Sequence, residues 1–550
     1  MASPDVRVTT GHEAADLDAR TIAAGVPSRA LMQRAGAAAA GEVAKLLPDL
    51  ATGAVVVYAG SGNNGGDGWV VARALASSGV AVDVVALGES RTDDARAERE
   101  LAEAEPLVRV ISREDHERDS AHGAPALIVD ALLGTGTRGA PREPVASAIA
   151  QIACARSGGA VVVSLDIPSG VDADTGAAEG AVLADVTLTF GTVKRGLLVA
   201  RGATGRIVAL DIGLTGAAEY EAQTAVPTDP VRYPLLVDGR WVRSVVPPFA
   251  AASHKGLRKK LVIVGGQLGM AGAPVLAARA AMRSGIGMVR LVVAPESLPV
   301  VQGSEPHALA RAWPEDDEAG WDEVVGGWAD VVLVGPGLGA SDRTRAMVER
   351  LLHAWRGPVV LDADALNVFA GEAESLGKLL AGRAALLTPH AMEFARLSGL
   401  ELANVLERRF DIGAGIARAT GAAVLLKGVP TIVTAPDGSR LVSASGTPVL
   451  AAAGSGDLLG GIAATLLAQT GDAQRSGAAA AWVHGRAAEI AEFGRRRGGE
   501  RQGKWRAHSH SSARGVTLAD VEAAIARVWA DDSRPPGFPV LAELPAVGGA

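Results

Sequence analysis

The sequence predicts an α/β protein with two domains, each built around a mainly parallel sheet with helices on both faces. Short runs of valine, isoleucine and leucine recur along the chain and alternate with helical stretches. Apolar runs of this length, flanked by glycine, are typical of strands buried on both faces. Their alternation with helices indicates parallel strands joined by helical crossovers. The length of 550 residues fits two to four domains at roughly 100–200 residues each.

The apolar runs fall into two sets, one in each half of the chain. They are Ala54–Tyr58, Val80–Leu87, Ala126–Val129 and Ala160–Leu165 in the first half, and Leu261–Val264, Val289–Val293, Val331–Val334, Val359–Leu361, Ala384–Leu387 and Ala423–Leu426 in the second.

A poorly patterned stretch that contains five prolines, Thr215–Pro248, separates the two sets. Such composition marks a domain boundary. We therefore expect one domain over residues 1–218 and another over 226–532, with the last helix at Leu518–Ala530. The basic stretch Gly494–Ser512 predicts a surface insertion, and the proline-rich tail over 533–550 predicts irregular structure.

Composition narrows the class of protein. A single cysteine, Cys154, excludes an intramolecular disulfide and a multi-thiolate metal site, and we expect it in the core. The net charge of -8 gives a nucleic-acid partner no general electrostatic support. No apolar run approaches the ~20 residues of a membrane span, and the N-terminus lacks the apolar segment of a secretory signal. We expect a cytoplasmic homo-oligomer that binds small molecules rather than nucleic acid or membranes.

A glycine-rich turn follows the first strand of the N-terminal half. The strand Ala54–Tyr58 leads into Gly-Ser-Gly-Asn-Asn-Gly-Gly-Asp-Gly, and a helix is predicted over Trp69–Ser78. A strand, a glycine-rich turn and a helix in this order direct backbone N–H groups at phosphate. The turn matches G-x-G-x-x-G. However, the acidic residue that a dinucleotide fold needs at the end of its second strand is out of place, which weakens a dehydrogenase interpretation.

Oxygen-bearing side chains cluster at three strand ends of this half. Asn63 and Asn64 stand among the glycines, and Asp130 and Asp166 each end a strand. Asparagine in a loop usually stabilises a turn, and an aspartate at a strand end is as often a helix cap. Together, beside an anion-binding turn, they predict a ligand site whose oxygens also suit a hard cation.

These segments resemble the YjeF N-terminal family, the NAD(P)H-hydrate epimerases, over roughly residues 5–215. The resemblance rests on Asn-Asn-Gly-Gly-Asp-Gly, Asp-Ala-Leu-Leu-Gly-Thr-Gly and Leu-Asp-Ile-Pro-Ser-Gly, in that order along the chain. It implies a Rossmann-like three-layer αβα domain. It places hydrated NAD(P)H at Asn63, Asn64, Gly65, Gly66, Asp67, Gly134, Thr135, Gly136, Thr137, Arg138, Gly139, Ala140 and Asp166, and potassium at Asn64, Asp130 and Ser169.

The chemistry of that substrate suits a carboxylate. Hydrated NAD(P)H carries a hydroxyl on C6 of the nicotinamide ring, next to the ring nitrogen. We expect acid catalysis to expel this hydroxyl as water, leaving an iminium to which water returns from the other face. Asp166 is the expected proton carrier, with electrostatic support from Lys194.

The C-terminal half carries a second site pattern, Gly-Ser-Gly-Asp457, ahead of the helical Leu458–Ala468. Its glycines free N–H groups at a helix N-terminus, and Asp457 can take a proton from a hydroxyl that attacks a phosphoryl group. Alone, Asp457 could equally be a helix cap, His390 a structural histidine and Lys427 a surface lysine. Because all three follow predicted strands or glycine turns of one half, we expect them to contact ligands.

This half resembles the ribokinase-like ADP/ATP-dependent NAD(P)H-hydrate dehydratases over roughly residues 235–530. The resemblance implies a ribokinase-like three-layer αβα domain in which Asp457 is the base for phosphorylation of the C6 hydroxyl, followed by loss of phosphate and a C5 proton. It implies ADP or ATP as co-substrate, giving AMP or ADP and phosphate, with Mg²⁺ at the phosphates. It places the hydrated nucleotide at Ala273, Gly337, His390 and Asp457, and the adenine nucleotide at Lys427, Gly428, Val429, Pro430, Thr431 and Gly456.

The order of the two halves matches a fused repair enzyme that epimerises the R and S forms and dehydrates the S form. The alternative is a ribokinase-type vitamin or sugar kinase with a nucleotide-sensing N-terminal domain. That kinase would release a stable phosphorylated product instead of NADH.

Overall fold

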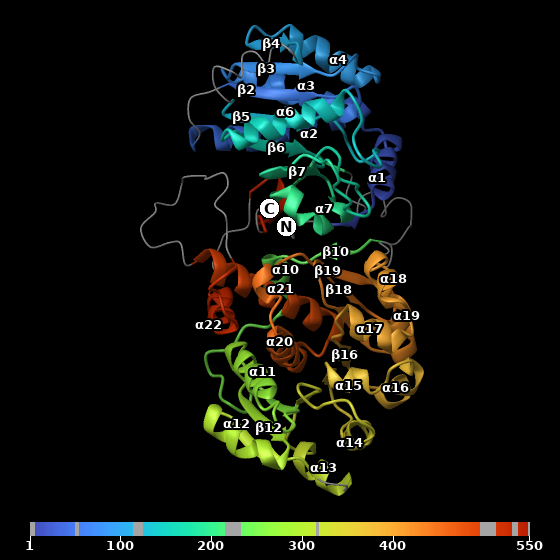
Figure 1. The fold of residues 1–550 in the computed structure, drawn as a ribbon, viewed down its shortest axis with the longest axis vertical. Coiled ribbons are helices and arrows are strands. Elements are labelled where there is room, and N and C mark those ends of the chain that lie inside the picture. The colour runs from blue at the N-terminus through green and yellow to red at the C-terminus, as the bar shows by residue number, and fades with distance from the viewer. Residues whose placement is uncertain are drawn as a thin grey trace. The chain divides into compact units, whose positions relative to one another are not determined.

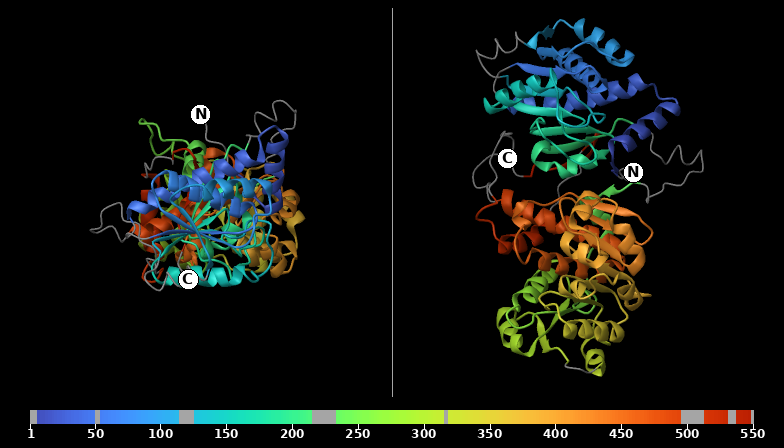
Figure 2. Two further views of the ribbon diagram at one scale, coloured as in Figure 1. Left: turned by 90° about the horizontal axis from the view of Figure 1, so that it is seen from above. Right: turned by 45° about the vertical axis from the view of Figure 1, so that its right-hand side comes forward.

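The computed structural model describes residues 6–49, 54–113, 125–214, 233–314, 318–494, 513–530 and 537–547. These residues form two compact units (Figure 1). The described residues of 6–214 and 537–547 make up the first unit, and those of 233–494 and 513–530 make up the second. In each unit, helices pack on both faces of one sheet (Figures 1 and 2).

The first unit contains an eight-stranded sheet in the order β20-β9-β7-β6-β5-β2-β3-β4. Its neighbouring strands are parallel except for β20, which runs antiparallel to β9. The strands are β2 (Val55–Ala59), β3 (Val82–Ala86), β4 (Val108–Ile111), β5 (Leu127–Ala131), β6 (Val161–Leu165), β7 (Val186–Phe190), β9 (Arg206–Leu210) and β20 (Val540–Leu544); β1 (Val8–Thr9) pairs separately with β8 (Val193–Lys194).

Two apolar layers cover this sheet. Buried side chains of α2 (Ser28–Leu46) and α3 (Asn63–Ser77) pack on one face, and those of α6 (Val145–Ser157) pack on the other. The unit is therefore the three-layer αβα domain that the sequence predicts. Its other helices are α1 (Gly11–Ala23), η1 (Leu47–Asp49), α4 (Asp93–Glu103), α7 (Arg195–Val199) and α8 (Arg201–Thr204).

The second unit contains a ten-stranded sheet in the order β10-β19-β18-β17-β16-β15-β14-β11-β12-β13. It is parallel except where β18 pairs with β17 and with β19. The strands are β10 (Leu235–Leu236), β11 (Lys260–Val264), β12 (Met288–Val293), β13 (Leu309–Ala312), β14 (Val331–Val334), β15 (Val359–Leu361), β16 (Ala385–Leu387), β17 (Ala423–Leu426), β18 (Thr431–Thr434) and β19 (Arg440–Ser443).

Helices also cover both faces of the second sheet. One face carries α11 (Gly272–Arg283), α20 (Ser455–Thr470), α21 (Ala473–Phe493) and α22 (Leu518–Trp529). The other carries α13 (Glu318–Val325), α14 (Asp342–Ala354), α16 (Ala373–Leu380), α17 (Ala391–Ser398) and α19 (Gly413–Thr420). The remaining elements are α10 (Gly239–Val245), η2 (Pro295–Ser297), α12 (Leu298–Ser304), α15 (Asp364–Asn367), α18 (Leu402–Glu407) and η3 (Pro448–Leu450).

All ten apolar runs predicted as strands are strands, and the last helix lies where it was expected. The first helix after β2 begins earlier than predicted, at Asn63 rather than Trp69. Its glycines are packing positions: a Cβ at Gly65 would lie 1.9 Å from the carbonyl oxygen of Gly60, and a Cβ at Gly68 would lie 2.7 Å from that of Ala131. Glycine lowers the local helix propensity, but here the helix still begins at Asn63 because the glycines let helix and sheet approach closely.

Two further expectations are wrong. Val540–Leu544, within the tail expected to be irregular, form β20, because they pair with β9 and bury Leu541 and Leu544. Cys154, expected in the core, lies on an exposed position of α6. The basic stretch 495–512 and the boundary stretch 215–232 lie outside the described residues.

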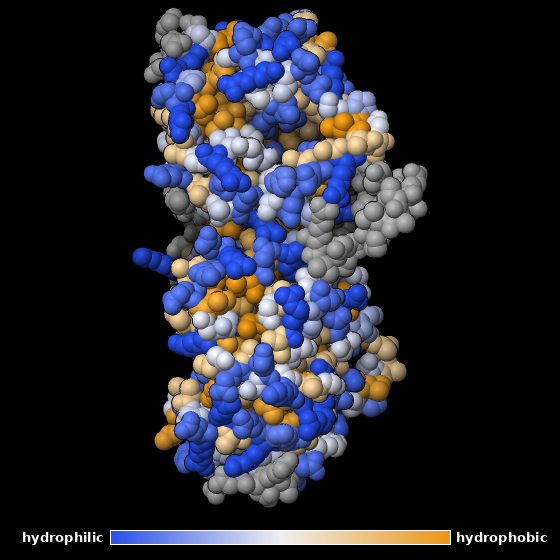
Figure 3. Space-filling view, turned by 90° about the vertical axis from the view of Figure 1, so that its right-hand side faces the viewer, coloured by the Kyte–Doolittle hydropathy of each residue, from blue (hydrophilic) through white to orange (hydrophobic). Residues whose placement is uncertain are grey.

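The surface is mostly hydrophilic on the face seen in Figure 3, where hydrophobic residues form small separate groups. None of the helices in the described part of the chain has the length and apolar character that crossing a bilayer requires.

Candidate active sites

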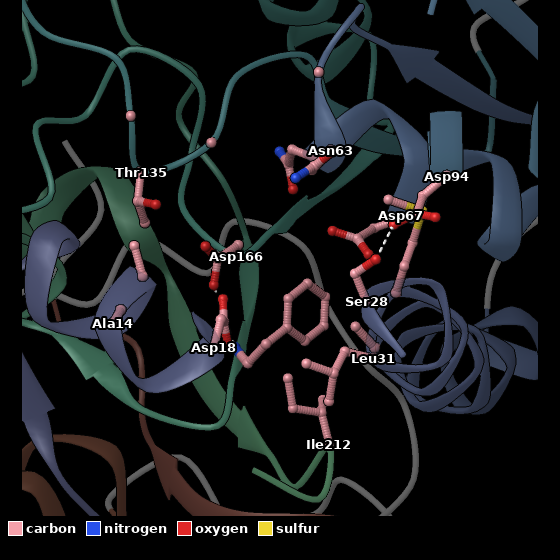
Figure 4. Close-up of a pocket in the computed structure, with 18 of the residues that line it drawn as sticks. Ala14, Asp18, Ser28, Leu31, Asn63, Asp67, Asp94, Thr135, Asp166 and Ile212 are labelled. Atoms are coloured by element: carbon pink, nitrogen blue, oxygen red, sulfur yellow. Dashed lines mark hydrogen bonds between the residues drawn. The ribbon is translucent and has the colours of Figure 1, made fainter. Parts of the chain in front are cut away.

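A cavity of about 530 Å³ opens in the first unit at the carboxyl ends of its strands (Figure 4). Residues of α1, α2 and the start of α3 line it, together with the segments that follow β5, β6, β7 and β9. Nine of the predicted site residues line this cavity, namely Asn63, Asn64, Asp67, Gly134, Thr135, Gly136, Thr137, Asp166 and Lys194.

The other predicted residues of this half lie outside the cavity lining. Gly65 and Gly66 face neighbouring backbone and Met32 instead. The exposed Arg138 is 3.5 Å from Asp174. Gly139 and Ala140 are not among the lining residues either. Of the segment 134–140, only residues 134–137 line the cavity.

Asp166 and Lys194 form a buried ion pair at the cavity wall. The Lys194 ammonium donates to Oδ1 of Asp166 and, at 3.1 Å, to the hydroxyl of Thr189. Only 3% of the lysine side chain and 17% of the aspartate side chain are exposed. Asp166 has a φ of 61°, a left-handed conformation that is costly for a residue with a Cβ and is found where a site holds a side chain in place. No described residue makes a hydrogen bond to its other oxygen, Oδ2, which remains available to a ligand.

Two more carboxyl groups line the same cavity. Burial, together with the negative charges of Asp166 and Asp18, raises the pKa of Asp67 well above its ordinary value. Desolvation also raises the pKa of Asp18 to about 6, with Lys194 opposing the shift and Asp166 adding to it. The charge of Lys194 lowers both pKa values in part, but among these carboxyl groups only Asp166 is in contact with the ammonium.

A buried network of oxygen atoms lies behind the cavity. Asp130 is fully buried and accepts from the Ser169 hydroxyl at 2.5 Å and from the Ser164 hydroxyl at 2.8 Å. The Ser169 hydroxyl also accepts from the backbone of Leu133 at 2.9 Å. The Asn64 amide nitrogen donates to the Leu133 carbonyl at 2.8 Å. Burial raises the pKa of Asp130 although these hydrogen bonds oppose it.

The amide oxygen of Asn64 is buried and has no hydrogen-bond partner among the described residues. A buried acceptor without a donor is costly, and a cation held through oxygen ligands would satisfy it. The oxygen ligands of Asn64, Asp130 and Ser169 therefore fit a hard cation.

Sequence reasoning missed the part of this cavity that comes from elsewhere in the chain. Asp18 is supplied by α1, and the apolar wall by Ile22, Leu31, Phe190 and Ile212. The helical spacing of Asp18 among polar residues of α1 makes it resemble an ordinary surface charge, so the sequence contained no signal for it.

In the second unit, Asp457 lies in the first turn of α20. Desolvation and the nearby charge of Asp362 raise its pKa to about 7, and Lys427 partly opposes the shift. The helix start fits tightly against these groups: a Cβ at Gly456 would lie 3.2 Å from the Lys427 ammonium and 3.9 Å from Oδ2 of Asp362. A side chain at position 456 would therefore press on the Lys427 ammonium, and Asp457 itself lies half-buried at this helix N-terminus.

Lys427 is paired with a carboxylate that the sequence did not single out. Its ammonium is 2.5 Å from Oδ1 of Asp362, and the Thr388 hydroxyl donates to the same oxygen at 2.8 Å. Burial alone would lower the pKa of Lys427, but the charges of Asp362 and Glu393 outweigh it and raise that pKa. The lysine is therefore a cation at the ends of three adjacent strands.

His390 caps α17. Its Nδ1 accepts from the backbone of Met392 and Glu393, and Glu393 accepts from the backbone of His390 at 2.8 Å. Burial raises the pKa of Glu393, which also interacts with Lys427. His390 thus serves as a helix cap, while half of its side chain stays exposed for a ligand.

The remaining predicted residues form two groups. A Cβ at Gly337 would lie 3.4 Å from that of Ala273, so these two are neighbours. The segment Gly428–Thr431 begins next to Lys427 and is held by Arg409, which donates to the Val429 carbonyl at 2.6 Å, and by the Thr431 hydroxyl, which donates to the Gly428 carbonyl at 2.9 Å.

His484 is a further residue that the sequence did not indicate. Its Nε2 is 3.3 Å from the hydroxyl of Ser455 at the start of α20. Burial and Lys427 lower its pKa to about 4, so it is neutral near pH 7 and braces the turn that carries Asp457.

The chain matches known proteins over most of its length. The family described as YjeF-related protein N-terminus matches residues 28–196, and the family described as NAD(P)H-hydrate dehydratase matches residues 261–497. The bifunctional NAD(P)H-hydrate repair enzyme Nnr of Moorella thermoacetica is 36% identical over 496 residues, covering 86% of this chain and 89% of the relative. That of Salinibacter ruber is 38% identical, covering 84% and 88%.

A solved structure is also similar to part of the chain. The ADP/ATP-dependent NAD(P)H-hydrate dehydratase from Bacillus subtilis, co-crystallised with ATP/Mg²⁺, is 25% identical with a TM-score of 0.44. The match covers 53% of this chain and 96% of that chain.

Proposed function

This chain belongs to the bifunctional NAD(P)H-hydrate repair enzymes, and from this premise we propose how its residues divide the work. The first unit is the NAD(P)H-hydrate epimerase and the second is the NAD(P)H-hydrate dehydratase. The observation that carries the assignment of residues is that each unit places its candidate catalytic aspartate near a buried lysine, at strand ends where a nucleotide can bind.

In the epimerase unit, Asp166 exchanges a proton with the oxygen on C6 of the substrate. Its Oδ1 is occupied by Lys194, so Oδ2 is the oxygen that meets the substrate. The turn at the start of α3 supplies N–H groups for phosphate, and the apolar wall around Phe190 accepts the nicotinamide ring and excludes water from the iminium.

Potassium fits the oxygen network of Asn64, Asp130 and Ser169. The ion would satisfy the unpartnered amide oxygen of Asn64 and would supply positive charge next to the segment after β5 that lines the cavity. The residues that would hold the ion come from α3 and from the ends of β5 and β6. The ion would therefore fix the positions of these cavity walls relative to one another.

In the dehydratase unit, Asp457 takes the proton from the C6 hydroxyl as that oxygen attacks the terminal phosphoryl group of the nucleotide. Its pKa of about 7 suits a base at neutral pH. Lys427 and the N-terminus of α20 stabilise the charge of the phosphates. The phosphorylated oxygen then leaves as phosphate while C5 loses a proton, which restores NADH or NADPH.

Mg²⁺ would enter with the nucleotide. Asp362 and Glu393 supply carboxylate oxygens near Lys427, which is the donor type that Mg²⁺ takes. In the described residues, no group of three or more histidine, cysteine, aspartate or glutamate side chains is arranged as a metal site. Mg²⁺ at a nucleotide site is commonly held by one or two carboxylates and by the phosphates. We infer ADP or ATP as the phosphoryl donor.

An epimer mixture of hydrated NADH tests both activities at once. With ADP or ATP present, absorbance of the restored dihydronicotinamide should rise to full conversion. A plateau once the S epimer is consumed would mean that the first unit is inactive. A stable phosphorylated product without NADH would overturn the proposal in favour of a kinase.

Cytoplasmic location and a homo-oligomeric state stay predictions from the sequence. Cell fractionation and light scattering of the purified protein test them.

A further inference from the structure

Asp67 and Asp166 lie on opposite walls of the epimerase cavity. Asp67 comes from the second turn of α3, and Asp166 follows β6. Both line the cavity, and Figure 4 shows them on opposite sides of it, with Asp18 beside Asp166. A flat ring bound between the two walls would present one face to Asp67 and the other to Asp166.

Epimerisation at C6 moves a hydroxyl from one face of the nicotinamide ring to the other. The hydroxyl must be protonated to leave as water, and the returning water must lose a proton on the opposite face. A carboxyl group fixed on one side of a bound ring reaches the oxygen on that side only, because proton transfer needs hydrogen-bond distance. Inversion therefore requires a proton carrier on each face.

We propose that Asp67 is a second catalytic acid–base of the epimerase, acting on the face of the nicotinamide ring opposite the face that Asp166 serves. The proposal rests on the epimerase activity assigned to this unit. It gives Asp67 a chemical role in addition to contact with the nucleotide.

The surroundings of the two groups differ. Asp166 is paired with the Lys194 ammonium. Asp67 has no such partner at hydrogen-bond distance among the described residues, and burial together with the charges of Asp166 and Asp18 raises its pKa. The cavity thus presents an ion-paired carboxyl group on one wall and, on the other, a carboxyl group that holds its proton more readily than usual.

The step balances with these two groups and water. Asp67 gives its proton to the C6 hydroxyl, the C6–O bond breaks, and water leaves as the ring nitrogen's electron pair forms the C6=N iminium. Water on the other face attacks C6, the iminium electron pair returns to nitrogen, and the water's proton passes to Asp166. Proton exchange with cavity water resets the pair, and the reverse reaction uses the same groups with their roles exchanged.

Exchange of the C6 oxygen with H₂¹⁸O separates the two faces. In Asp67→Asn, Asp166 still serves its own face, so one epimer should exchange oxygen with retention while inversion falls by about 10²-fold or more. In Asp166→Asn, the other epimer should be the one that exchanges. The readout is ¹⁸O content of each epimer, separated chromatographically, against a reaction without enzyme.

Two variants control this test. Asp93→Asn removes an exposed carboxylate of α4 outside the cavity and should leave inversion within about twofold. Asp67→Glu keeps an acid at the wall and should invert faster than Asp67→Asn, which guards against a misfolded Asn variant.

Other outcomes overturn the proposal. Inversion by Asp67→Asn at the wild-type rate would do so, as would equal loss of exchange from both epimers. A pattern of face-selective exchange in Asp18→Asn instead would assign the second face to Asp18. If the wild-type enzyme itself does not interconvert the epimers, the assigned epimerase activity fails rather than this inference.

Discussion

The Lys427 ammonium lies 2.5 Å from Oδ1 of Asp362, although 65 residues separate the two in the chain. The pair joins the ends of β17 and β15, beside the start of α20. Burial raises the pKa of Asp457, Asp362 adds to this shift and Lys427 opposes it. The ionisation of the proposed base therefore depends in part on a pair that does not itself take the proton.

Asp362→Asn should move the pH dependence of the dehydratase toward acid. Removal of a negative charge makes ionisation of Asp457 easier, so its pKa falls from about 7 and the base stays active at lower pH. The measurement is kcat/KM against pH from 5 to 9. Asp437→Asn, which changes an exposed aspartate between β18 and β19, should leave the profile in place, and an alkaline shift in Asp362→Asn would contradict the argument.

Asp457→Asn should lose dehydratase activity by about 10²–10⁴-fold, the usual contribution of a general base, with epimerase activity intact. Both rates are measured on one preparation. Loss of both activities would point to a folding defect instead.

The same variant should be more stable than the wild type at alkaline pH. The pKa of Asp457 is raised to about 7 in the folded protein. Below that pH the folded protein keeps the carboxyl group protonated, and above it the folded protein must hold a charged carboxylate in a partly buried place, which is costly. The stability gain of Asp457→Asn should build up as pH rises from about 4 to about 7 and then stay constant. The full pKa shift would convert to a stability difference at about 1.4 kcal/mol per pKa unit. Because Asp457 is only half-buried and solvent screens its charge, we expect a smaller total gain of about 1–2 kcal/mol. Denaturant titrations of the second unit's transition at pH 5 and pH 8 measure it.

Lys194→Met should lower epimerase activity by about 10²-fold and leave the dehydratase unchanged. The substitution keeps the apolar stem but removes the ammonium that holds Oδ1 of Asp166, so the carboxyl group loses its fixed position. Lys45→Met, at an exposed lysine of α2, is the matched control. Unchanged epimerase kinetics in Lys194→Met would remove Lys194 from the mechanism.

Potassium should stabilise the first unit, and Asn64→Ala should abolish that effect. An ion at about ten times its Kd adds roughly 1.4 kcal/mol to the free energy of unfolding. Thermal unfolding in K⁺ and in a bulky organic cation measures the difference, and Asn63→Ala should keep the response. Equal midpoints in the two salts for the wild type would contradict the site.

A chain that ends at residue 536 should lose stability in its first unit. It lacks β20, exposes the edge of β9 and loses the burial of Leu541 and Leu544, which together cost about 3 kcal/mol or more. The midpoint of the first unit's unfolding should fall while the second unit's stays in place. An unchanged midpoint would show that β20 adds nothing to the sheet.

The local sequence determines the strands of this protein and several of its candidate site residues. The ten apolar runs are strands because a short stretch of valine, isoleucine and leucine is stable as a strand that is buried between two apolar layers. The motif around Asp457 sets its own position at a helix N-terminus, and Asp166 and Lys194 line the cavity as the sequence predicts. These features depend on neighbours a few residues away.

The tertiary structure decided what depends on distant neighbours. It started α3 at Asn63, because glycines pack against the sheet there, and it added β20 to a strand more than 300 residues away in sequence. It also brought Asp18 beside Asp166, Asp67 to the wall opposite Asp166, and Asp362 to Lys427. The charge on a carboxyl group depends on its burial and on the charges that the fold places around it, and spacing along the chain carries neither.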